Sequence, residues 1–340
     1  MTELAQWTHA TARPRRLAVT GGLGFVGRHL TRHLLAAGHD VLVLDVNRPR
    51  SSTLPSGARF RQVDLREPNA VTAACAGLDT VYHLAGNSSG TRSVVEPLFD
   101  FQTNAVGTAN VCQAAVAAGV SRLVYLSTAM VYGRPTVVPI PEDHPTEPFL
   151  PYGASKLAGE HMVRSFHETF GLDTVIGRAF VIYGPGENPK VAGGEVSQYL
   201  RWHLNHHPVH ATGIIDRKTR DFAHVTDVVR ALHTIGEQGA TSTVYNIGTG
   251  SEYSLRELVE VIGEATGRPV DLRVDESITD DSYRHVPDIS RLRRLGYRPH
   301  TSLSSGVRSL AEVLGDTPEM PAVPTIFRPG QHYETAAVAS

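Results

Sequence analysis

Tyr152 and Lys156 stand four residues apart at the predicted start of a long helix, which extends to Phe170. Residues at this spacing lie on one face of a helix, so the two side chains would project together. A phenol that titrates at about pH 10 is a weak base at neutral pH, but a neighbouring ammonium favours the phenolate. Thr128 follows a predicted strand, and its hydroxyl could orient the reacting oxygen. Together the three side chains could remove a proton from an alcohol.

A glycine-rich turn near the start of the chain predicts a dinucleotide site. The apolar run Leu17–Thr20 predicts a buried strand, and Gly21, Gly24 and Gly27 follow it before a predicted helix that continues to Ala37. Glycine lets backbone N–H groups and a helix N-terminus approach a diphosphate closely. A glycine turn without a nucleotide is the simpler alternative, but strand, turn and helix in this order favour dinucleotide binding.

Asp45 favours NAD as that dinucleotide. It follows the predicted strand Val41–Leu44, where a carboxylate accepts hydrogen bonds from the adenosine ribose and disfavours a 2′-phosphate. Arg48, three residues further on, leaves NADP open as the alternative. The positive nicotinamide ring of NAD⁺ would accept a hydride and add to the stabilisation of a Tyr152 phenolate, while Lys156 could hold the nicotinamide ribose.

Strands and helices alternate through the first half of the chain. The strands already named are followed by predicted strands at 59–63, 80–84, 122–126 and 174–178, and a long helix is predicted over 97–120. This alternation predicts an α/β fold with a parallel, doubly wound sheet of the Rossmann type.

The loosening of this pattern after Phe180 predicts a second, smaller α/β lobe. We expect a dinucleotide-binding domain over 15–180, to which 219–247 return, and a discontinuous substrate-binding lobe over 181–315. Ser254 and Glu257 form a capping-box pattern that predicts a helix to Thr266. Residues 316–340 predict an extended or disordered tail.

Composition excludes several classes of partner. The chain of 340 residues has a formal net charge of −2, which argues against nucleic acid and anionic membranes as partners. It has no apolar run of about 18 residues, so no membrane span is predicted. The polar residues 1–14 do not resemble a signal peptide, and the two cysteines, Cys75 and Cys112, lie in apolar contexts. We therefore expect a cytoplasmic protein with reduced thiols.

These motifs resemble the extended short-chain dehydrogenase/reductases, in particular the NAD-dependent nucleotide-sugar epimerases and dehydratases such as the UDP-glucose 4-epimerases. The resemblance runs from about Arg15 to about Val313 and includes Arg178, Tyr183–Gly186, Arg220–Phe222, Asp227 and Asn246–Gly250. It implies that NAD oxidises a sugar hydroxyl, usually at C4, while Tyr152 takes the proton. In an epimerase, the hydride then returns to the opposite face of the keto sugar.

The resemblance also implies roles for individual residues. Residues expected to contact NAD are Gly21, Gly24, Phe25, Val26, Gly27, Asp45, Asn47, Arg48, Asp64, Leu65, Leu84, Ala85, Gly86, Asn104, Tyr152, Lys156 and Phe180. Residues expected to contact a nucleotide-diphosphate sugar are Ser88, Thr128, Ala129, Met130, Lys190, Arg217, Arg220 and Arg284. Asp64 could bond the adenine amino group or cap the following helix. Asn104 could bridge strand ends through water or face solvent.

Two positions after Thr128 favour epimerisation over related reactions. Dehydratases of this family carry an Asp–Glu pair there, and decarboxylases carry a Glu at the second position, but this chain has Ala129 and Met130. Without those carboxyl groups, elimination of water across C5–C6 lacks its acid and base. A 4-epimerase remains the first hypothesis and an NAD(P)-dependent ketoreductase the second. A catalytically silent nucleotide-binding protein is the third, and the retained Thr128, Tyr152 and Lys156 argue against it.

The substrate side departs from the epimerase pattern at two positions. Val181 replaces an Asn that contacts the substrate diphosphate, and Ile278 replaces an Arg. Arg220 matches the family's phosphate-binding Arg, whose planar guanidinium suits a diphosphate. Neighbouring cations could replace the missing contacts, so a nucleotide diphosphate is the expected ligand, with another nucleotide or a substrate lacking one as alternatives.

Two further patterns concern metal binding and assembly. His203, His206, His207 and His210 are close in sequence, but no Cys or acid joins them, and a solvated face is favoured over a metal site. The long helices 97–120 and 153–170 match those that form a dimer interface in the family. A homodimer is expected, with a monomer as the alternative.

Overall fold

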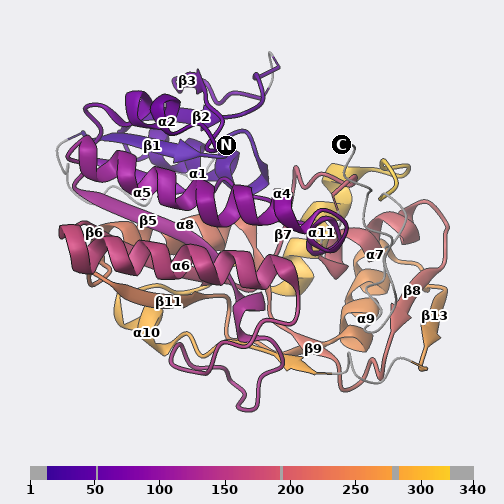
Figure 1. Cartoon of the computed structure of the whole chain (residues 1–340). Helices are drawn as coiled ribbons and strands as arrows, with labels where there is room; N and C mark the ends of the chain where they lie inside the picture. The colour runs from indigo at the N-terminus through magenta and orange to yellow at the C-terminus, as the bar shows by residue number, and fades with distance from the viewer. Residues whose placement is uncertain (1–13, 51–52, 192–193, 278–282, 322–340) are drawn as a thin grey trace, which may run out of the picture.

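A seven-stranded parallel sheet organises the larger part of the computed structural model, which describes residues 14–50, 53–191, 194–277 and 283–321 (Figure 1). The strand order is β11-β6-β5-β4-β1-β2-β3, and every neighbouring pair is parallel. The predicted doubly wound α/β fold is therefore confirmed. The strands are β1 (Arg16–Thr20), β2 (Asp40–Asp45), β3 (Arg59–Gln62), β4 (Thr80–His83), β5 (Arg122–Thr128), β6 (Asp173–Ala179) and β11 (Thr243–Ile247).

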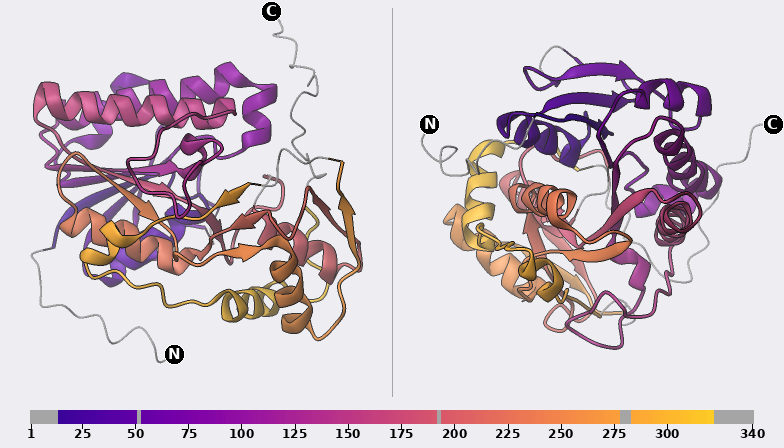
Figure 2. Two further views of the ribbon diagram at one scale, coloured as in Figure 1. Left: turned by 90° about the horizontal axis from the view of Figure 1, so that it is seen from below. Right: turned by 90° about the vertical axis from the view of Figure 1, so that its left-hand side faces the viewer.

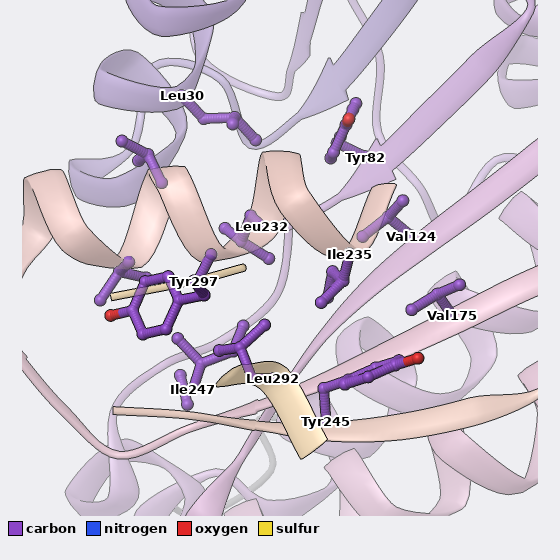
Figure 3. Packing of buried hydrophobic residues seen from close by; sticks show 14 of the residues in the cluster. Leu30, Tyr82, Val124, Val175, Leu232, Ile235, Tyr245, Ile247, Leu292 and Tyr297 are labelled. Atoms are coloured by element: carbon purple, nitrogen blue, oxygen red, sulfur yellow. The ribbon is translucent and has the colours of Figure 1, made fainter. Parts of the chain in front are cut away.

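Helices cover both faces of this sheet (Figure 2). Strand alternation explains the two cores, because Leu17 and Val19 of β1 belong to one buried cluster and Ala18 to the other. Figure 3 shows residues of the first cluster, in which Ile235 lies near Val124 and Tyr245. Its helices are α1 (Phe25–Ala36) and α8 (Val225–Gln238), whereas α2 (Pro68–Cys75), α5 (Gly107–Ala117) and α6 (Pro151–Phe170) cover the other face.

The helix predicted over 97–120 is interrupted, which corrects the prediction of one regular helix. After α3 (Gly90–Val95), it consists of α4 (Pro97–Phe101), a π-helical turn η1 (Gln102–Val106) and α5. Such turns insert one residue into a helix and are frequent at functional sites. The inserted turn contains Asn104, which is 1% exposed.

A smaller lobe with its own core stands beside the sheet. It contains α7 (Glu195–Leu204), α9 (Leu255–Thr266) and α11 (Leu303–Leu314), whose apolar sides pack together. Both halves of the predicted capping box, Ser254 and Glu257, are present at the start of α9. The short strand pairs are β7 (Val181–Tyr183) with β10 (Phe222–His224), β8 (Val209–Thr212) with β13 (Leu272–Asp275), and β9 (Thr219–Arg220) with both β12 (Tyr253–Ser254) and β14 (Arg284–His285).

The first residues of the predicted tail pack on this lobe. The carbonyl oxygen of Pro318 accepts a hydrogen bond from Asn205 Nδ2 at 2.8 Å, and that of Glu319 accepts one from Arg201 Nη1 at 2.8 Å. The remainder of the predicted tail, from residue 322, lies outside the described residues. Among the helices that the structure describes, none has the length and apolar character needed to cross a membrane.

Candidate active site

Lys156 is buried at the carboxyl edge of the sheet. Helix α6 begins at Pro151, whose missing N–H is harmless at a first helical position, and Lys156 follows one turn after Tyr152. Lys156 Nζ lies 4.2 Å from the centroid of the Tyr125 ring, and the residue is 5% exposed. Burial lowers the pKa of Lys156 to about 7, against the opposing charges of Glu160 and Asp100.

Tyr152 and Thr128 are brought together, as the chemistry proposed from the sequence requires. The Thr128 hydroxyl hydrogen-bonds to Tyr152, and its oxygen also accepts the Met130 N–H at 3.2 Å, capping the short 3₁₀ helix η2 (Ala129–Tyr132). Burial raises the pKa of Tyr152 to about 12, although the bond to Thr128 opposes the shift. The phenol is therefore protonated at neutral pH in the protein alone, and activation as a base requires a further positive charge.

A buried ion pair fixes the helix that carries Tyr152. Glu160 of α6 is completely buried, and its carboxylate accepts hydrogen bonds from the Ser127 hydroxyl at 2.6 Å and from Arg178 Nη2 at 2.7 Å. Ser127 belongs to β5 and Arg178 to β6. The network joins α6 to two central strands, and in β5 it does so through the residue that precedes Thr128. Sequence reasoning did not assign Glu160 a role.

Asn104 bridges elements by direct bonds. Its Oδ1 accepts the Asn87 N–H at 2.8 Å, and its Nδ2 donates to Ser155 Oγ at 3.0 Å. Ser155 in turn donates to Asp100 Oδ2 at 2.5 Å. Of the two alternatives left open by the sequence, bridging or exposure to solvent, the structure shows bridging through these protein groups. The π-helical turn thereby links the end of β4 to α6.

The turn that contains Gly21, Gly24 and Gly27, called the glycine cradle below, lies at the N-terminus of α1. Gly21 has a φ of 66°, and a Cβ on it would lie 2.8 Å from Ala85 Cα, so only glycine fits between the ends of β1 and β4. A Cβ on Gly27 would collide with the Gly21 carbonyl oxygen. The cap residue Gly24 makes no side-chain hydrogen bond. Such a helix end presents backbone N–H groups that suit the diphosphate of NAD.

Asp45, which the sequence predicts to bind the adenosine ribose, accepts two backbone hydrogen bonds beside this cradle. Its Oδ2 accepts the Leu23 N–H at 3.1 Å and its Oδ1 accepts the Asn47 N–H at 3.0 Å. A carboxylate has further lone pairs, so ribose hydroxyls can still donate to it. Arg48 Nε donates to Gln62 Oε1 at 2.9 Å, which places its guanidinium against β3.

Asp64 does not cap the following helix, which removes one of its two predicted roles. The cap residue of α2 is Glu67, and it makes no side-chain cap bond. Asp64 instead accepts hydrogen bonds from the Arg66 guanidinium, which lowers the pKa of its carboxyl. Leu65 is buried beside it, and its carbonyl oxygen accepts from Asn110 Nδ2 at 2.8 Å.

His285 is buried next to the carboxyl edge of the sheet, and the sequence did not indicate this histidine as a site residue. Its ring centroid lies 5.2 Å from that of Phe180, and it hydrogen-bonds to the Ala129 backbone while its Nε2 has no partner. Burial lowers its pKa to about 3, so the imidazole is neutral at pH 7. No local pattern in the sequence distinguishes it from the other histidines.

The predicted substrate cations occupy different environments. Arg220 is 6% exposed, stacks on Tyr283 at 4.6 Å and lies 3.6 Å from Glu195. Arg284 forms a bidentate pair with Glu252, both bonds being 2.6 Å. Lys190 pairs with Glu319 at the surface, and both Arg217 and Ser88 are exposed. Ile278 lies outside the described residues.

The histidines expected to form a solvated face do so only in part. His206, His207 and His210 are exposed, but His203 is buried, and its Nε2 lies 2.8 Å from Thr266 Oγ1. Within the described ranges, the one group with metal-ligand spacing is elsewhere, at His39, His233 and Glu237.

Comparisons with known proteins place this architecture among enzymes. The model of the NAD-dependent epimerase/dehydratase family matches residues 17–248. The UDP-glucose 4-epimerase of Mycolicibacterium smegmatis is 34% identical over 306 residues, which cover 87% of this chain and 97% of that protein.

Two solved structures match over most of the chain. The UDP-glucose 4-epimerase of Thermus thermophilus, in complex with NAD, is 31% identical with a TM-score of 0.80, and the match covers 88% of this chain and 98% of that one. The UDP-glucose 4-epimerase of Thermotoga maritima, with UDP-glucose, is 29% identical with a TM-score of 0.81 over the same shares of the two chains. The resemblance drawn from the sequence motifs is confirmed.

Proposed function

Since the chain belongs to the NAD-dependent epimerase/dehydratase family, we propose that it epimerises a nucleoside-diphosphate sugar at C4. NAD, when bound, supplies a hydride acceptor that also returns the hydride. The observation that carries the proposal is the hydrogen bond of Thr128 to Tyr152, with Lys156 one turn further along α6. These groups lie at the carboxyl edge of the sheet, the edge that the glycine cradle also occupies.

The chain's own residues would handle the proton. Tyr152 accepts the proton of the sugar hydroxyl and gives it back after the keto sugar has turned over. Thr128 orients that hydroxyl through the same oxygen that now bonds Tyr152. Lys156 holds ribose hydroxyls and, as an ammonium, favours the phenolate. Glu160 keeps the helix in place through Ser127 and Arg178.

We assign NAD to the cradle on three features of the described residues. The glycine positions leave no room for a Cβ, the N-terminus of α1 lacks a side-chain cap, and Asp45 ends β2. Phe25 and Val26 would donate backbone N–H groups to the diphosphate. The adenosine would lie toward Asn47, Arg48, Asp64 and Leu65, and the nicotinamide half toward Leu84, Ala85, Gly86, Asn104 and Phe180.

The environment of Ala129 and Met130 supports epimerisation over dehydration. Ala129 is 3% exposed, and its buried neighbour His285 is a neutral imidazole rather than a carboxyl group. Elimination across C5–C6 would need an acid and a base at this place. The His285 imidazole can accept a hydrogen bond from a sugar hydroxyl, but it has no carboxylic proton to donate.

We propose UDP-glucose and UDP-galactose as the first substrates to test. UDP-glucose is the ligand named for the Thermotoga maritima structure. Arg220 is buried and planar and is the cation best placed to bond a diphosphate. Arg284, Lys190, Arg217 and Ser88 remain proposed substrate contacts, and the first two now pair with Glu252 and Glu319.

We also propose that the chain forms a homodimer in the cytoplasm. Leu98 is 70% exposed, Phe101 50% and Val106 43%, all on the interrupted helix beside α6. A helical face with this much exposed apolar surface is typical of an interface. Leu98→Glu should convert the dimer to a monomer in sedimentation velocity.

The cysteines support the cytoplasmic location. Cys75 and Cys112 are free, buried thiols, which suit a reducing compartment.

The decisive experiment follows UDP-glucose by NMR with purified protein and no added cofactor. Conversion to UDP-galactose is expected, with no net change in NADH absorbance. Tyr152→Phe should lower kcat by about 10²- to 10⁴-fold. Tyr245→Phe is the matched control, because the Tyr245 hydroxyl accepts only a structural bond from the Ala240 N–H, and it should retain activity. Consumption of added NAD(P)H would favour the ketoreductase, and full activity of Tyr152→Phe would overturn both assignments.

A further inference from the structure

Three histidines and a glutamate meet at the edge of the sheet opposite the active site. His33 lies in the last turn of α1, His39 precedes β2, and His233 and Glu237 lie four residues apart near the end of α8. Helices α1 and α8 pack against each other (Figure 2), which brings residues 200 positions apart in sequence together. None of these side chains takes part in the proposed reaction.

The donor atoms of the cluster lie somewhat further apart than the ligand atoms of an occupied metal site. One ligand atom each from His39, His233 and Glu237 lies within 4.8 Å of the others. His233 Nε2 is 3.8 Å from Glu237 Oε1. A tetrahedral Zn²⁺ with bonds of about 2 Å needs donors about 3.3 Å apart, so side-chain rotation would close the site. Two imidazoles and one carboxylate are a common zinc donor set.

His33 occupies the place of a supporting residue. Its Nε2 lies 2.9 Å from His233 Nδ1, which leaves the other ring nitrogen of His233 facing Glu237. An imidazole that binds a metal through one nitrogen commonly donates its other N–H to a neighbouring acceptor, which fixes the ring and its tautomer. His33 can be that acceptor.

The ends of two helices favour a bound cation at the cluster. Both α1 and α8 end there, and helix C-termini attract positive charge. Arg15, which forms an ion pair with Glu237, is the cation that a metal ion would replace there.

We propose that His39, His233 and Glu237 bind one Zn²⁺ or a similar transition-metal ion, with His33 orienting His233. The ion would link the turn between α1 and β2 to the end of α8. Because it sits at the amino ends of the strands, it would stabilise the fold without touching substrate. Arg15 forms an ion pair with Glu237, and its backbone N–H lies 3.4 Å from His39 Nδ1. Metal binding would therefore require the Arg15 guanidinium to release the Glu237 carboxylate.

Zinc titration of the full chain without a polyhistidine tag, after chelator treatment and dialysis, tests the proposal. Competition with a chromophoric chelator should show one saturable Zn²⁺ site per chain, and Co²⁺ should give the visible bands of a four-coordinate site. Zinc at 100 times its Kd should raise the Tm by about 4 °C. His39→Gln, His233→Gln and Glu237→Gln should each remove the saturable site.

Two further variants test whether zinc binds at this cluster rather than at surface histidines. His33→Gln should weaken zinc binding about 10- to 100-fold. His207→Gln removes an exposed histidine of the α7–β8 segment and should leave the affinity unchanged. Zinc-free Tm and circular dichroism establish that each variant is folded. Absence of saturable binding in the wild-type chain, equal affinity in His39→Gln, or loss of the site in His207→Gln would overturn the proposal.

Discussion

Loss of the buried ion pair between Glu160 and Arg178, which lies behind the active site, should destabilise the fold more than loss of an exposed pair. The two side chains are 0% and 3% exposed, and the bond between them is 2.7 Å. Glu160→Gln preserves size and the acceptor for Ser127 but removes the charge that faces Arg178. The guanidinium would then stay buried without a carboxylate, held by neutral acceptors such as the Glu142 carbonyl oxygen, at 3.1 Å from Nη1.

Leaving one member of such a pair without its partner costs about 3–5 kcal/mol in free energy of unfolding. For a chain of this length the unfolding entropy converts that cost into a Tm lower by about 4–7 °C. Removing both charges costs less than the sum of the single changes, because no unpaired charge remains. The double variant Glu160→Gln/Arg178→Met should therefore show a coupling of about 2–3 kcal/mol.

Urea unfolding followed by circular dichroism measures these free energies. The matched control is Asp40→Asn, which breaks the pair with Arg59, whose side chains are 45% and 56% exposed, respectively. That change should cost less than about 1 kcal/mol, because water solvates an exposed pair. If Glu160→Gln costs no more than Asp40→Asn, or if the double variant is simply additive, the assigned role of the pair is wrong.

Three further outcomes follow from the cradle and from a buried histidine. Gly27→Ala should abolish NAD retention, measured by mass spectrometry, because its Cβ would collide with the Gly21 carbonyl oxygen, whereas Gly90→Ala, whose Cβ would lie 3.4 Å from Leu150 Cδ1, should retain NAD. Asp45→Ala should weaken NAD binding in calorimetry by about 10- to 100-fold, with a smaller loss for NADP, since charged hydrogen bonds contribute about 1.5–3 kcal/mol. Burial lowers the pKa of His83 to about 3, so the unfolded chain binds a proton between pH 3 and 6.5 that the folded chain does not. Stability should fall as pH drops through this window, and His83→Asn should flatten the slope in urea unfolding by up to about 1.4 kcal/mol per pH unit.

The sequence predicted those features that local patterns specify. Strand, glycine turn and helix follow from adjacent residues, and so do the capping box at Ser254 and the alternation that gives the parallel sheet. Spacing by four also placed Tyr152 and Lys156 on one turn of α6. In each case the residues that determine the structure lie within a few positions of one another.

Features that depend on distant contacts escaped prediction. The π-helical turn at Asn104 accompanies bonds to Asn87 and Ser155, and the second of these partners is 51 positions away. His285 becomes a neighbour of Phe180 only because β14 and the end of β6 meet in the fold. Helix α11 is a different case, because Leu303, Val307 and Leu310 already carry helical spacing behind the cap Ser302. This local pattern is sufficient to predict the helix.

In the proposed reaction, hydride leaves sugar C4 for bound NAD and returns to the same carbon while Tyr152 moves the hydroxyl proton. UDP-glucose deuterated at C4 tests this most directly, with the protein free of added NADH and the products analysed by NMR and mass spectrometry. We predict that the UDP-galactose formed carries the deuterium at C4 at every time point sampled. Deuterium lost to water, transferred to C6 or captured by added NAD would contradict the mechanism.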